Sequence, residues 1–544
     1  MKVIKAPIKV RIIFPLVILL GLSALICLQR LHTYDEPLER DLTLYAVIGH
    51  ELLEGRALYS DLCENKPPAV FLTYAAAEKL VGYGPGAVFL LGIFAAILTL
   101  LGVYAAGFAL GGSMETGVWA AIFWTAICSS LTLQANQPNT EVFINACIIW
   151  AFVLMLRSDD RFPWLRRYIA IGALLALASL YKMVVISIAG TLSLAHLALP
   201  PGEPPDRKLA GKQIGVIAAT GAVIWASVFA YFAAVGNFRD FYEIVFVFNG
   251  YYTGDVIENL RIGLTFFEGF LQYAVQLIYL ICIGSLLIAS HNLKRPWGLL
   301  LGLAIGTQLA VALPGKFYPH YFLYWLPTLA VALAWMIEEF GRLLPNYSLW
   351  IKCLAGIGVA VFFAGHELPN YKISSTEWSQ EKYGDIFVDS KIVGKEISQL
   401  LAPGETFYEW GAESGLYFYS QRRPPAGVLF CWHLHEGFPY AAQLSKRVVQ
   451  DLDKAQPELF IIGGWSLIKY KTYLLRPNPV LKWFSSRYRP FSKKGPFIFY
   501  ARRGGKLEAR LSNNIDPGEQ GGVDFGNKVL EKVKSINFVA LNQD

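Results

Sequence analysis

Residues 11–41 read RIIFPLVILLGLSALICLQRLHTYDEPLERD, and they join an apolar stretch of membrane-spanning length to a cluster of charged side chains. The cations at its start are Lys2, Lys5, Lys9 and Arg11. No small-residue cleavage site follows the apolar part, so the sequence predicts a retained signal anchor whose N-terminus is cytoplasmic. The acidic segment that comes next, residues 35–68, is then placed outside the membrane, and we expect the chemistry there.

The composition extends this interpretation to the rest of the chain. Of the 544 residues, 54% are hydrophobic and only 16% are charged, which is typical of a polytopic α-helical membrane protein. Because a membrane helix needs about 20 apolar residues, we predict about eleven such helices. They lie near 11–29, 86–110, 115–133, 140–156, 167–182, 183–199, 213–235, 263–290, 297–313, 319–338 and 349–366. The stretch 167–199 is either one long broken helix or two short ones.

Lysine and arginine are distributed unevenly among the loops. If the sides alternate from a cytoplasmic N-terminus, the basic loops 157–167, 200–212 and 291–295 fall inside, as the positive-inside rule requires. Residues 30–85 and everything after Gly365 then fall outside. An error of one span would undo this placement. We therefore expect a multi-pass protein of the cytoplasmic (inner) membrane whose polar residues converge on the extracytoplasmic face.

The composition changes after residue 366, where we place the end of the transmembrane domain (1–366). Residues 367–503 are of mixed polarity, and their short alternating runs predict a small extracytoplasmic α/β domain. These runs include 405–410, 459–462 and 497–501. Residues 504–544 are polar and weakly periodic, which is typical of a loosely attached tail.

Two carboxylates on the outer face are the candidate catalytic residues. Asp41 opens the amphipathic stretch 42–53, which we expect to lie in the membrane interface and to hold the carboxylate in place. A carboxylate held in this way can take a proton from an acceptor hydroxyl or bind a metal. Glu141 begins an apolar helix, where its charge either complements the helix dipole or has a function. The alternative for the acidic segment is a solvated loop with a local ion pair.

Basic and aromatic side chains supply the complementary half of the predicted site. Lysine binds phosphate as a point charge, so several lysines on one face suit a phosphate or pyrophosphate leaving group, whereas any single one could simply snorkel to the interface. The candidates for binding the donor phosphate are Lys66, Lys182, Lys316 and His320. The side chains that suit a sugar, or alternatively an interfacial belt, are Tyr45, Tyr59, Asn249 and Tyr321.

Sequence motifs for several other chemistries are missing. There is no Walker A motif, no glycine-rich dinucleotide fingerprint and no clustered Cys/His motif, so ATP hydrolysis, nicotinamide redox chemistry and a zinc-finger-like site lack support. The formal net charge of +7 is explained as topology signal and does not call for nucleic acid as a partner.

Several short motifs occur in a specific order and spacing over most of residues 30–430. They are Glu39-Arg40-Asp41, Tyr45 to Gly49, Leu53-Glu54-Gly55, Tyr59, Lys66-Pro67-Pro68, Asn139-Thr140-Glu141, Phe241 to Asn249, Lys316 to Phe322 and Trp410-Gly411 to Pro424. Together they resemble bacterial membrane glycosyltransferases of the GT-C fold, in the dolichyl-phosphate-mannose protein mannosyltransferase-like superfamily, which includes the aminoarabinose transferases.

The resemblance implies a hexosyl- or pentosyltransferase that takes a sugar from a polyprenyl-phosphate donor and attaches it to a lipid, glycan or protein acceptor outside the cytoplasm. It implies that Asp41 is the acceptor-activating carboxylate, Glu141 the second acidic residue and Lys66 a contact of the donor phosphate. Many relatives carry Asp-Glu at the first motif, whereas Asp41 is followed by Leu42. This departure makes a divalent metal doubtful, and no other cofactor is expected.

Two other classes of protein remain open at this point. A transporter or lipid-linked saccharide flippase would carry buried charges and broken helices along a path through the middle of the membrane, and the sequence shows no matched inverted halves. A receptor whose membrane part is only an anchor would not need about eleven helices.

Overall fold

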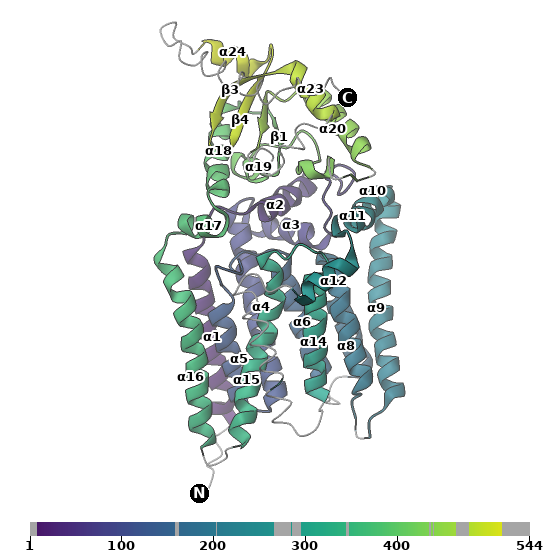
Figure 1. The fold of residues 1–544 in the computed structure, drawn as a ribbon, viewed down its shortest axis with the longest axis vertical. Helices are drawn as coiled ribbons and strands as arrows, with labels where there is room; N and C mark the ends of the chain where they lie inside the picture. Colours follow the sequence, from purple (N-terminus) through teal and green to yellow (C-terminus); the bar gives the residue numbers. More distant parts are fainter. Residues whose placement is uncertain are drawn as a thin grey trace.

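The structure is a computed structural model. It describes residues 8–157, 163–202, 204–265, 284, 295–343, 347–434, 437–438, 440–463 and 478–513. A bundle of long helices forms one part, and a smaller region with a sheet covers one end of it (Figure 1).

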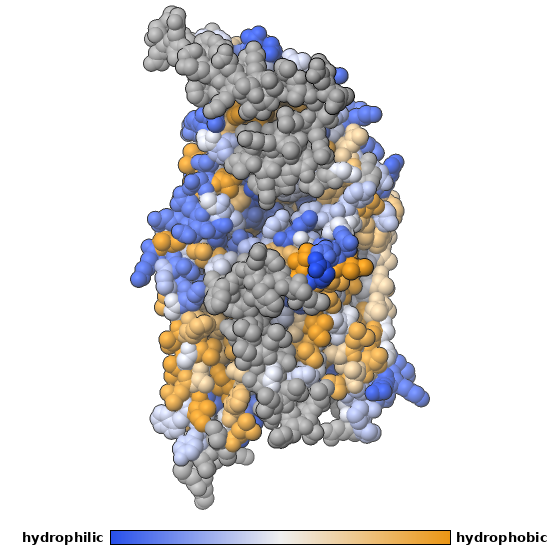
Figure 2. Space-filling model, viewed as in Figure 1, coloured by the Kyte–Doolittle hydropathy of each residue, from blue (hydrophilic) through white to orange (hydrophobic). Residues whose placement is uncertain are grey.

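The bundle is built from the apolar segments of the first two thirds of the chain. Its helices are α1 (Ile8–His32), α4 (Pro85–Gly111), α5 (Met114–Ile127), α6 (Thr140–Leu156), α7 (Trp164–Tyr181), α8 (Ile186–Ala198), α9 (Arg207–Ala234), α14 (Arg295–Ala312), α15 (Leu326–Leu343) and α16 (Ser348–Glu367). Hydrophobic side chains gather on its outer surface, and hydrophilic ones gather toward the covered end (Figure 2).

Ten of the predicted spans coincide with these helices, and most of the predicted span 263–290 lies outside the described residues. Within the described ranges, five helical stretches are long and apolar enough to cross a membrane by themselves. They are Ile13–His32, Pro85–Gly111, Arg207–Ala234, Pro319–Leu343 and Ser348–Lys372. The helices and their apolar surface indicate a membrane-embedded protein, and the number of eleven spans stays a prediction.

The structure decides between the two alternatives for 167–199 and shortens one other predicted span. The stretch 167–199 forms two helices, α7 and α8, joined through a short 3-10 turn at Met183–Val185, and Lys182 stands at the break in extended backbone. Helix α5 ends at Ile127 and not near 133. The Arg30 guanidinium donates hydrogen bonds to the carbonyl oxygens of Cys128 at 2.8 Å and Ala135 at 3.2 Å, which fixes residues 128–139 as an irregular connection.

The first outer segment, which we define as residues 33–68, crosses the top of the bundle. It contains helix α2 (Arg40–Leu53) and leads into α3 (Ala69–Val81), and both lie below the C-terminal sheet in Figure 1. The expectation of an interfacial stretch at 42–53 is only half right. The helix exists, but every residue from Leu42 to Gly49 is buried, because the end of the chain covers the face that would have met water.

The C-terminal region, residues 368–513, contains a four-stranded sheet of order β1-β2-β4-β3. Its strands are β1 (Phe407–Trp410), β2 (Leu459–Ile462), β3 (Tyr488–Lys494) and β4 (Phe497–Arg502). Strand β1 is parallel to β2, and the other two pairings are antiparallel. Pro490, which cannot donate to a ladder, lies in the edge strand β3 next to a register shift. The three predicted runs correspond to β1, β2 and β4, so the small sheet is confirmed.

Helices flank this sheet and connect its strands. They are α17 (Ser375–Tyr383), α18 (Ile386–Leu400), α19 (Gly415–Ser420), α20 (Ala441–Ala455), α23 (Pro479–Arg487) and α24 (Lys506–Asn513). The first residues of the predicted tail form α24, and Arg510 donates to both carboxylate oxygens of Glu405 at 2.7 and 2.6 Å. Residues 514–544 lie outside the described ranges.

Short helical pieces complete the covered end of the bundle. They are α10 (Phe238–Tyr242), a π-helix at Glu243–Phe248, α11 (Asn249–Thr253), α12 (Val256–Thr265) and 3-10 turns at Pro319–Trp325, Leu368–Lys372 and Cys431–Leu434.

A buried ion pair joins the C-terminal region to the first outer segment. Lys382 of α17 pairs with Glu36, and each side chain is only 1% exposed. The amides of Asn136 and Gln137 donate to the same carboxylate at 2.5 and 2.8 Å, and Lys382 also donates to Asn136 Oδ1 at 3.0 Å. One carboxylate thus ties together three parts of the chain.

Backbone contact reinforces this attachment. The amide of Cys63 donates to the carbonyl oxygen of Gly427 at 2.9 Å. A Cβ atom at position 427 would stand 1.7 Å from the carbonyl oxygen of Asp61, so only glycine permits the two segments to approach this closely.

We expect Lys382→Met to lower the free energy of unfolding by about 3 to 5 kcal/mol, because it leaves the Glu36 carboxylate buried without its cation. The measurement is unfolding of the purified protein in detergent. Lys372→Met, at an exposed lysine of the same region, is the control and should change little. The double variant Glu36→Gln with Lys382→Met should recover part of the loss; a Lys382→Met protein as stable as the parent would contradict the role of the pair.

Candidate active site

The first turn of α2 places Asp41 at the covered end of the bundle. A carboxylate at this position is favoured by the positive end of the helix dipole. Its side chain is partly exposed, whereas Glu36 and Glu39 on the same segment are buried. Asp41 interacts electrostatically with Lys66, Lys182 and His320. The structure therefore brings one accessible carboxylate together with three of the four predicted phosphate-binding residues.

Lys66 lies in the connection between α2 and α3. Its side chain is 21% exposed, and its Nζ atom is 3.6 Å from Glu64 Oε1. Burial lowers the pKa of Lys66, but the charges of Asp41, Glu64 and the other nearby carboxylates raise it by more, so the pKa lies above its usual value. Lys66 is thus held as a cation that is still open to a ligand.

Glu64 is a functional candidate that the sequence alone did not identify. Its side chain is 2% exposed, and its Oε2 atom has no hydrogen-bond partner within the described part of the chain. Burial raises the pKa of Glu64 to about 7, although Lys66 acts in the opposite direction. The signal was its position two residues before Lys66 in the same charged motif, which keeps the two side chains near each other.

Glu141 and Lys182 form a buried ion pair between α6 and the break that follows α7. The Lys182 Nζ atom donates to Glu141 Oε1 at 2.8 Å, and the two side chains are 12% and 0% exposed. Glu141 also accepts hydrogen bonds from the hydroxyls of Thr140 at 3.0 Å and Tyr324 at 3.5 Å. Both carboxylate oxygens of Glu141 are therefore occupied, and Lys182 is the more accessible member of the pair.

Aromatic rings contact the ammonium groups of Lys182 and Lys316. Lys182 Nζ lies 3.3 Å from the centre of the Tyr321 ring, and Lys316 Nζ lies 4.3 Å from that of Tyr252. Such cation–π contacts fix the position of an ammonium group without neutralising its charge. His320 shares a hydrogen bond of 3.1 Å with Gln134 Oε1, from the connection between α5 and α6.

The other predicted sugar-binding residues hold the first outer segment in place. Tyr45 and Tyr59 are fully buried. The Tyr45 hydroxyl donates to Asn139 Oδ1 at 3.3 Å, and that of Tyr59 donates to the Lys66 carbonyl oxygen at 2.9 Å. Asn249 accepts from Asn65 Nδ2 at 2.9 Å and donates to the Asn65 carbonyl oxygen at 2.7 Å. The contacts of Tyr59 and Asn249 fix the backbone carbonyls of Lys66 and Asn65, whereas Tyr45 ties α2 to the start of α6.

Strained backbone is concentrated around the site. Five non-glycine residues in the described ranges have positive φ angles, and three of them are beside site residues. Tyr59 (φ 71°) holds Lys66, Gln134 (φ 58°) contacts His320, and Phe317 (φ 50°) follows Lys316. Such conformations are uncommon outside glycine and persist only where surrounding contacts enforce them.

The described side chains contain no group of three His, Cys, Asp or Glu residues close enough to hold a metal ion. The acidic groups near Asp41 are instead interleaved with lysines.

Comparisons with known proteins identify the fold of the chain. No protein-family model matches the sequence, and no curated protein matches it. Solved structures do match. ArnT from Cupriavidus metallidurans bound to undecaprenyl phosphate superposes with a TM-score of 0.57 at 16% identity, covering 89% of this chain and 97% of that one. The same protein in the apo state gives a TM-score of 0.58 at 17% identity, with the same coverage.

A second similar protein comes from an archaeon. It is the oligosaccharyltransferase AglB from Archaeoglobus fulgidus in complex with an inhibitory peptide and a dolichol-phosphate, with a TM-score of 0.53 and 13% identity. The superposition covers 93% of this chain and 75% of that one. ArnT and AglB are both GT-C fold enzymes. At these identities the likeness shows the fold, and the chain therefore has the GT-C fold that its motifs predict.

Proposed function

We propose that this chain is an integral-membrane glycosyltransferase that moves a sugar from a polyprenyl-phosphate donor to an acceptor on the extracytoplasmic face. The observation that carries the proposal is that the partly exposed Asp41 lies close enough to Lys66 and Lys182 to interact with both electrostatically. Two similar structures contain lipid phosphates, undecaprenyl phosphate in ArnT and dolichol-phosphate in AglB, and the second also contains a peptide. The acceptor here is a lipid, a glycan or a protein.

The proposed reaction needs one base and one cationic site. The Asp41 carboxylate takes the proton of an acceptor hydroxyl, and the hydroxyl oxygen forms a bond to the anomeric carbon of the sugar. The bond from that carbon to the phosphate oxygen breaks, and the polyprenyl phosphate leaves with the electron pair. Lys66 neutralises the charge that develops on it, so no resident cofactor is proposed. Attack opposite the leaving group inverts the anomeric centre.

Glu141 takes a positioning role in this scheme. Because both of its oxygens have protein partners, it is poorly placed to receive a proton from an acceptor. It holds Lys182 against the Tyr321 ring, so that the ammonium group lies beside the proposed phosphate site. Lys316 and His320 extend the same cationic surface, with Tyr252 and Gln134 fixing their positions.

The charge distribution favours an enzyme over a transporter. In the bundle helices α1, α4 to α9 and α14 to α16, every described Asp, Glu, Lys and Arg lies close to a helix end. A transport path would instead require ionisable groups near the middle of the membrane.

Transfer itself is tested with purified protein. We expect it to release free polyprenyl phosphate from a polyprenyl-phosphate sugar when membrane extract supplies the acceptor. A panel of donors with different sugars, all failing to release lipid phosphate, would count against the proposal.

We expect Asp41→Asn to lower the transfer rate by about a hundredfold to ten-thousandfold, because the amide keeps the shape of the side chain and removes its basicity. Donor binding should be retained, as measured by co-purification of the lipid donor. Asp35→Asn, at an exposed carboxylate of the same segment, is the matched control. Near-normal turnover by the Asp41→Asn variant would show that Asp41 is not the base.

Lys66→Ala should raise the KM for the donor by about tenfold or more, which is the expected cost of one charge-assisted contact to phosphate. The exposed Lys79 of α3 provides the control, and Lys79→Ala should leave the KM unchanged. If both variants bind the donor as the parent does, the lysine only snorkels to the interface.

The KM for the donor should also depend on pH through Glu64. Its pKa is raised to about 7, so it is mostly protonated below that pH and ionised above it. Ionisation places a negative charge beside Lys66 and weakens the attraction for phosphate. The KM should therefore rise as the pH increases through about 7, and Glu64→Gln should flatten that rise. The free energy of unfolding should also fall as the pH increases through about 7. The folded state holds the Glu64 proton more tightly than the unfolded state does, and this advantage is lost once the proton is removed. An identical pH profile in both proteins would exclude Glu64 as its cause.

A further inference from the structure

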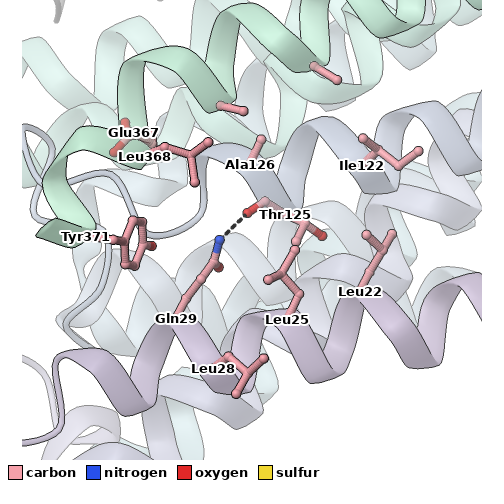
Figure 3. Close-up of a pocket in the computed structure, with 12 residues that line it drawn as sticks. Leu22, Leu25, Leu28, Gln29, Ile122, Thr125, Ala126, Glu367, Leu368 and Tyr371 are labelled. Atoms are coloured by element: carbon pink, nitrogen blue, oxygen red, sulfur yellow. Dashed lines mark hydrogen bonds between the residues drawn. The ribbon is translucent and has the colours of Figure 1, made fainter.

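Helices α1, α5 and α16 enclose a cavity of about 360 Å³ (Figure 3). Its lining includes none of the residues assigned to the candidate active site. Ligand pockets in proteins commonly hold about 300 to 1,000 Å³, so the space is large enough for part of a ligand. Most of the wall is apolar and is made by Leu22, Leu25, Leu28, Ile122, Ala126 and Leu368.

The cavity is reached from the lipid side of the bundle. Leu25 and Leu28 line it and are also 46% and 62% exposed. In a membrane-embedded protein these surfaces face hydrocarbon, so a lipid chain can enter from the side without crossing water.

Polar side chains mark one end of the cavity. Figure 3 shows Glu367, Leu368 and Tyr371 together at this end, with Gln29 reaching across to the Thr125 carbonyl oxygen at 3.1 Å. These residues stand where α1 and α16 leave the bundle, close to α17 in Figure 1. This end is therefore at the level of lipid head groups.

Glu367 is the unusual member of this set. It is only 7% exposed, and its Oε2 atom accepts a hydrogen bond from Asn370 Nδ2 at 3.2 Å. The Ser130 hydroxyl and the Leu131 backbone amide also donate to this carboxylate, and the neighbouring His366 interacts with it electrostatically. Within the described residues, no Lys or Arg forms an ion pair with it, and none lines the cavity. A carboxylate shielded from water without a cation is unfavourable. No described Lys, Arg or His side chain lines the polar end of the cavity, although Arg30 lies near Tyr371 and is engaged by the connection 128–139.

We propose that this cavity binds a membrane phospholipid whose head group carries a primary ammonium group. An acyl chain packs against the leucines, and the ammonium donates hydrogen bonds to Glu367. An anionic head group does not fit, because it would meet a carboxylate and no lining cation. A quaternary ammonium head group supplies charge but has no N–H to donate.

The bound lipid would also steady the loop that carries part of the candidate site. Ser129 Oγ donates to Gln29 Oε1 at 3.1 Å, next to Arg30, which fixes the irregular connection 128–139. Asn139 and Gln134 of that connection contact Tyr45 and His320. A lipid at α1 and α16 therefore contacts residues that hold one part of the connection, while the candidate site contacts another part.

The test measures lipid retention by native mass spectrometry of the full-length protein in detergent. Phosphatidylethanolamine, phosphatidylcholine and phosphatidylglycerol with the same acyl chains are offered in equal amounts. The parent should retain the ethanolamine lipid about tenfold better than the choline lipid, which is the expected effect of one charge-assisted hydrogen bond. Glu367→Gln should abolish this preference. Glu115→Gln, at an exposed carboxylate on the other end of α5, should preserve it.

A second variant tests the cavity itself. Ala126→Leu fills the apolar wall and should reduce retention of all three lipids in the same proportion. Equal retention of the ethanolamine and choline lipids by the parent protein overturns the proposal without any variant, as does a preference for phosphatidylglycerol. An unchanged preference in Glu367→Gln, or unchanged retention in Ala126→Leu, overturns it as well.

Discussion

Charged groups that are shielded from water require partners, and the first outer segment obtains its partners from distant parts of the chain. Arg40 pairs with Glu413 of the C-terminal region at 3.1 Å, and Glu36 pairs with Lys382. Asn139, from the start of α6, donates to Glu39 at 3.3 Å. Asp41, unlike Glu36 and Glu39, remains partly exposed. The burial of its neighbours fixes the helix turn that carries it.

The two buried carboxylates of the site, Glu141 and Glu64, differ in their partners. Glu141 has a lysine ammonium at 2.8 Å and two hydroxyl donors, which together satisfy both of its oxygens. Glu64 is 3.6 Å from the nearest ammonium and keeps one oxygen without a partner in the described chain. Burial is nearly the same for both. Glu141 therefore serves as a fixed anion, while Glu64 has a pKa of about 7 and can change its charge near neutral pH.

The sequence predicted the helical bundle because apolar length is a local property, readable from about 20 consecutive residues. It also predicted that Asp41, Lys66 and Lys182 share one face, because that follows from counting spans. It could not show that Glu141 and Lys182 are paired, or that Glu36 meets Lys382, since such contacts depend on how separate helices pack. Likewise the stretch 42–53 has the pattern of an interfacial helix, and only the covering C-terminal region makes it a buried one.

The contact between Arg40 and Glu413 spans 373 residues of sequence, and this distance has a consequence for biosynthesis. A chain that grows at about 5 to 20 residues per second needs roughly 20 to 75 s to reach Glu413 after Arg40 has been made. Helices α1 to α16 can enter the membrane during that time. For most of it, Arg40 and Glu36 lack Glu413 and Lys382, their ion-pair partners in the finished molecule. The segment with Asp41 is therefore among the first parts to be synthesised and the last to reach its final form, and a ribosome that stops before the C-terminal region leaves an inserted bundle without a completed site.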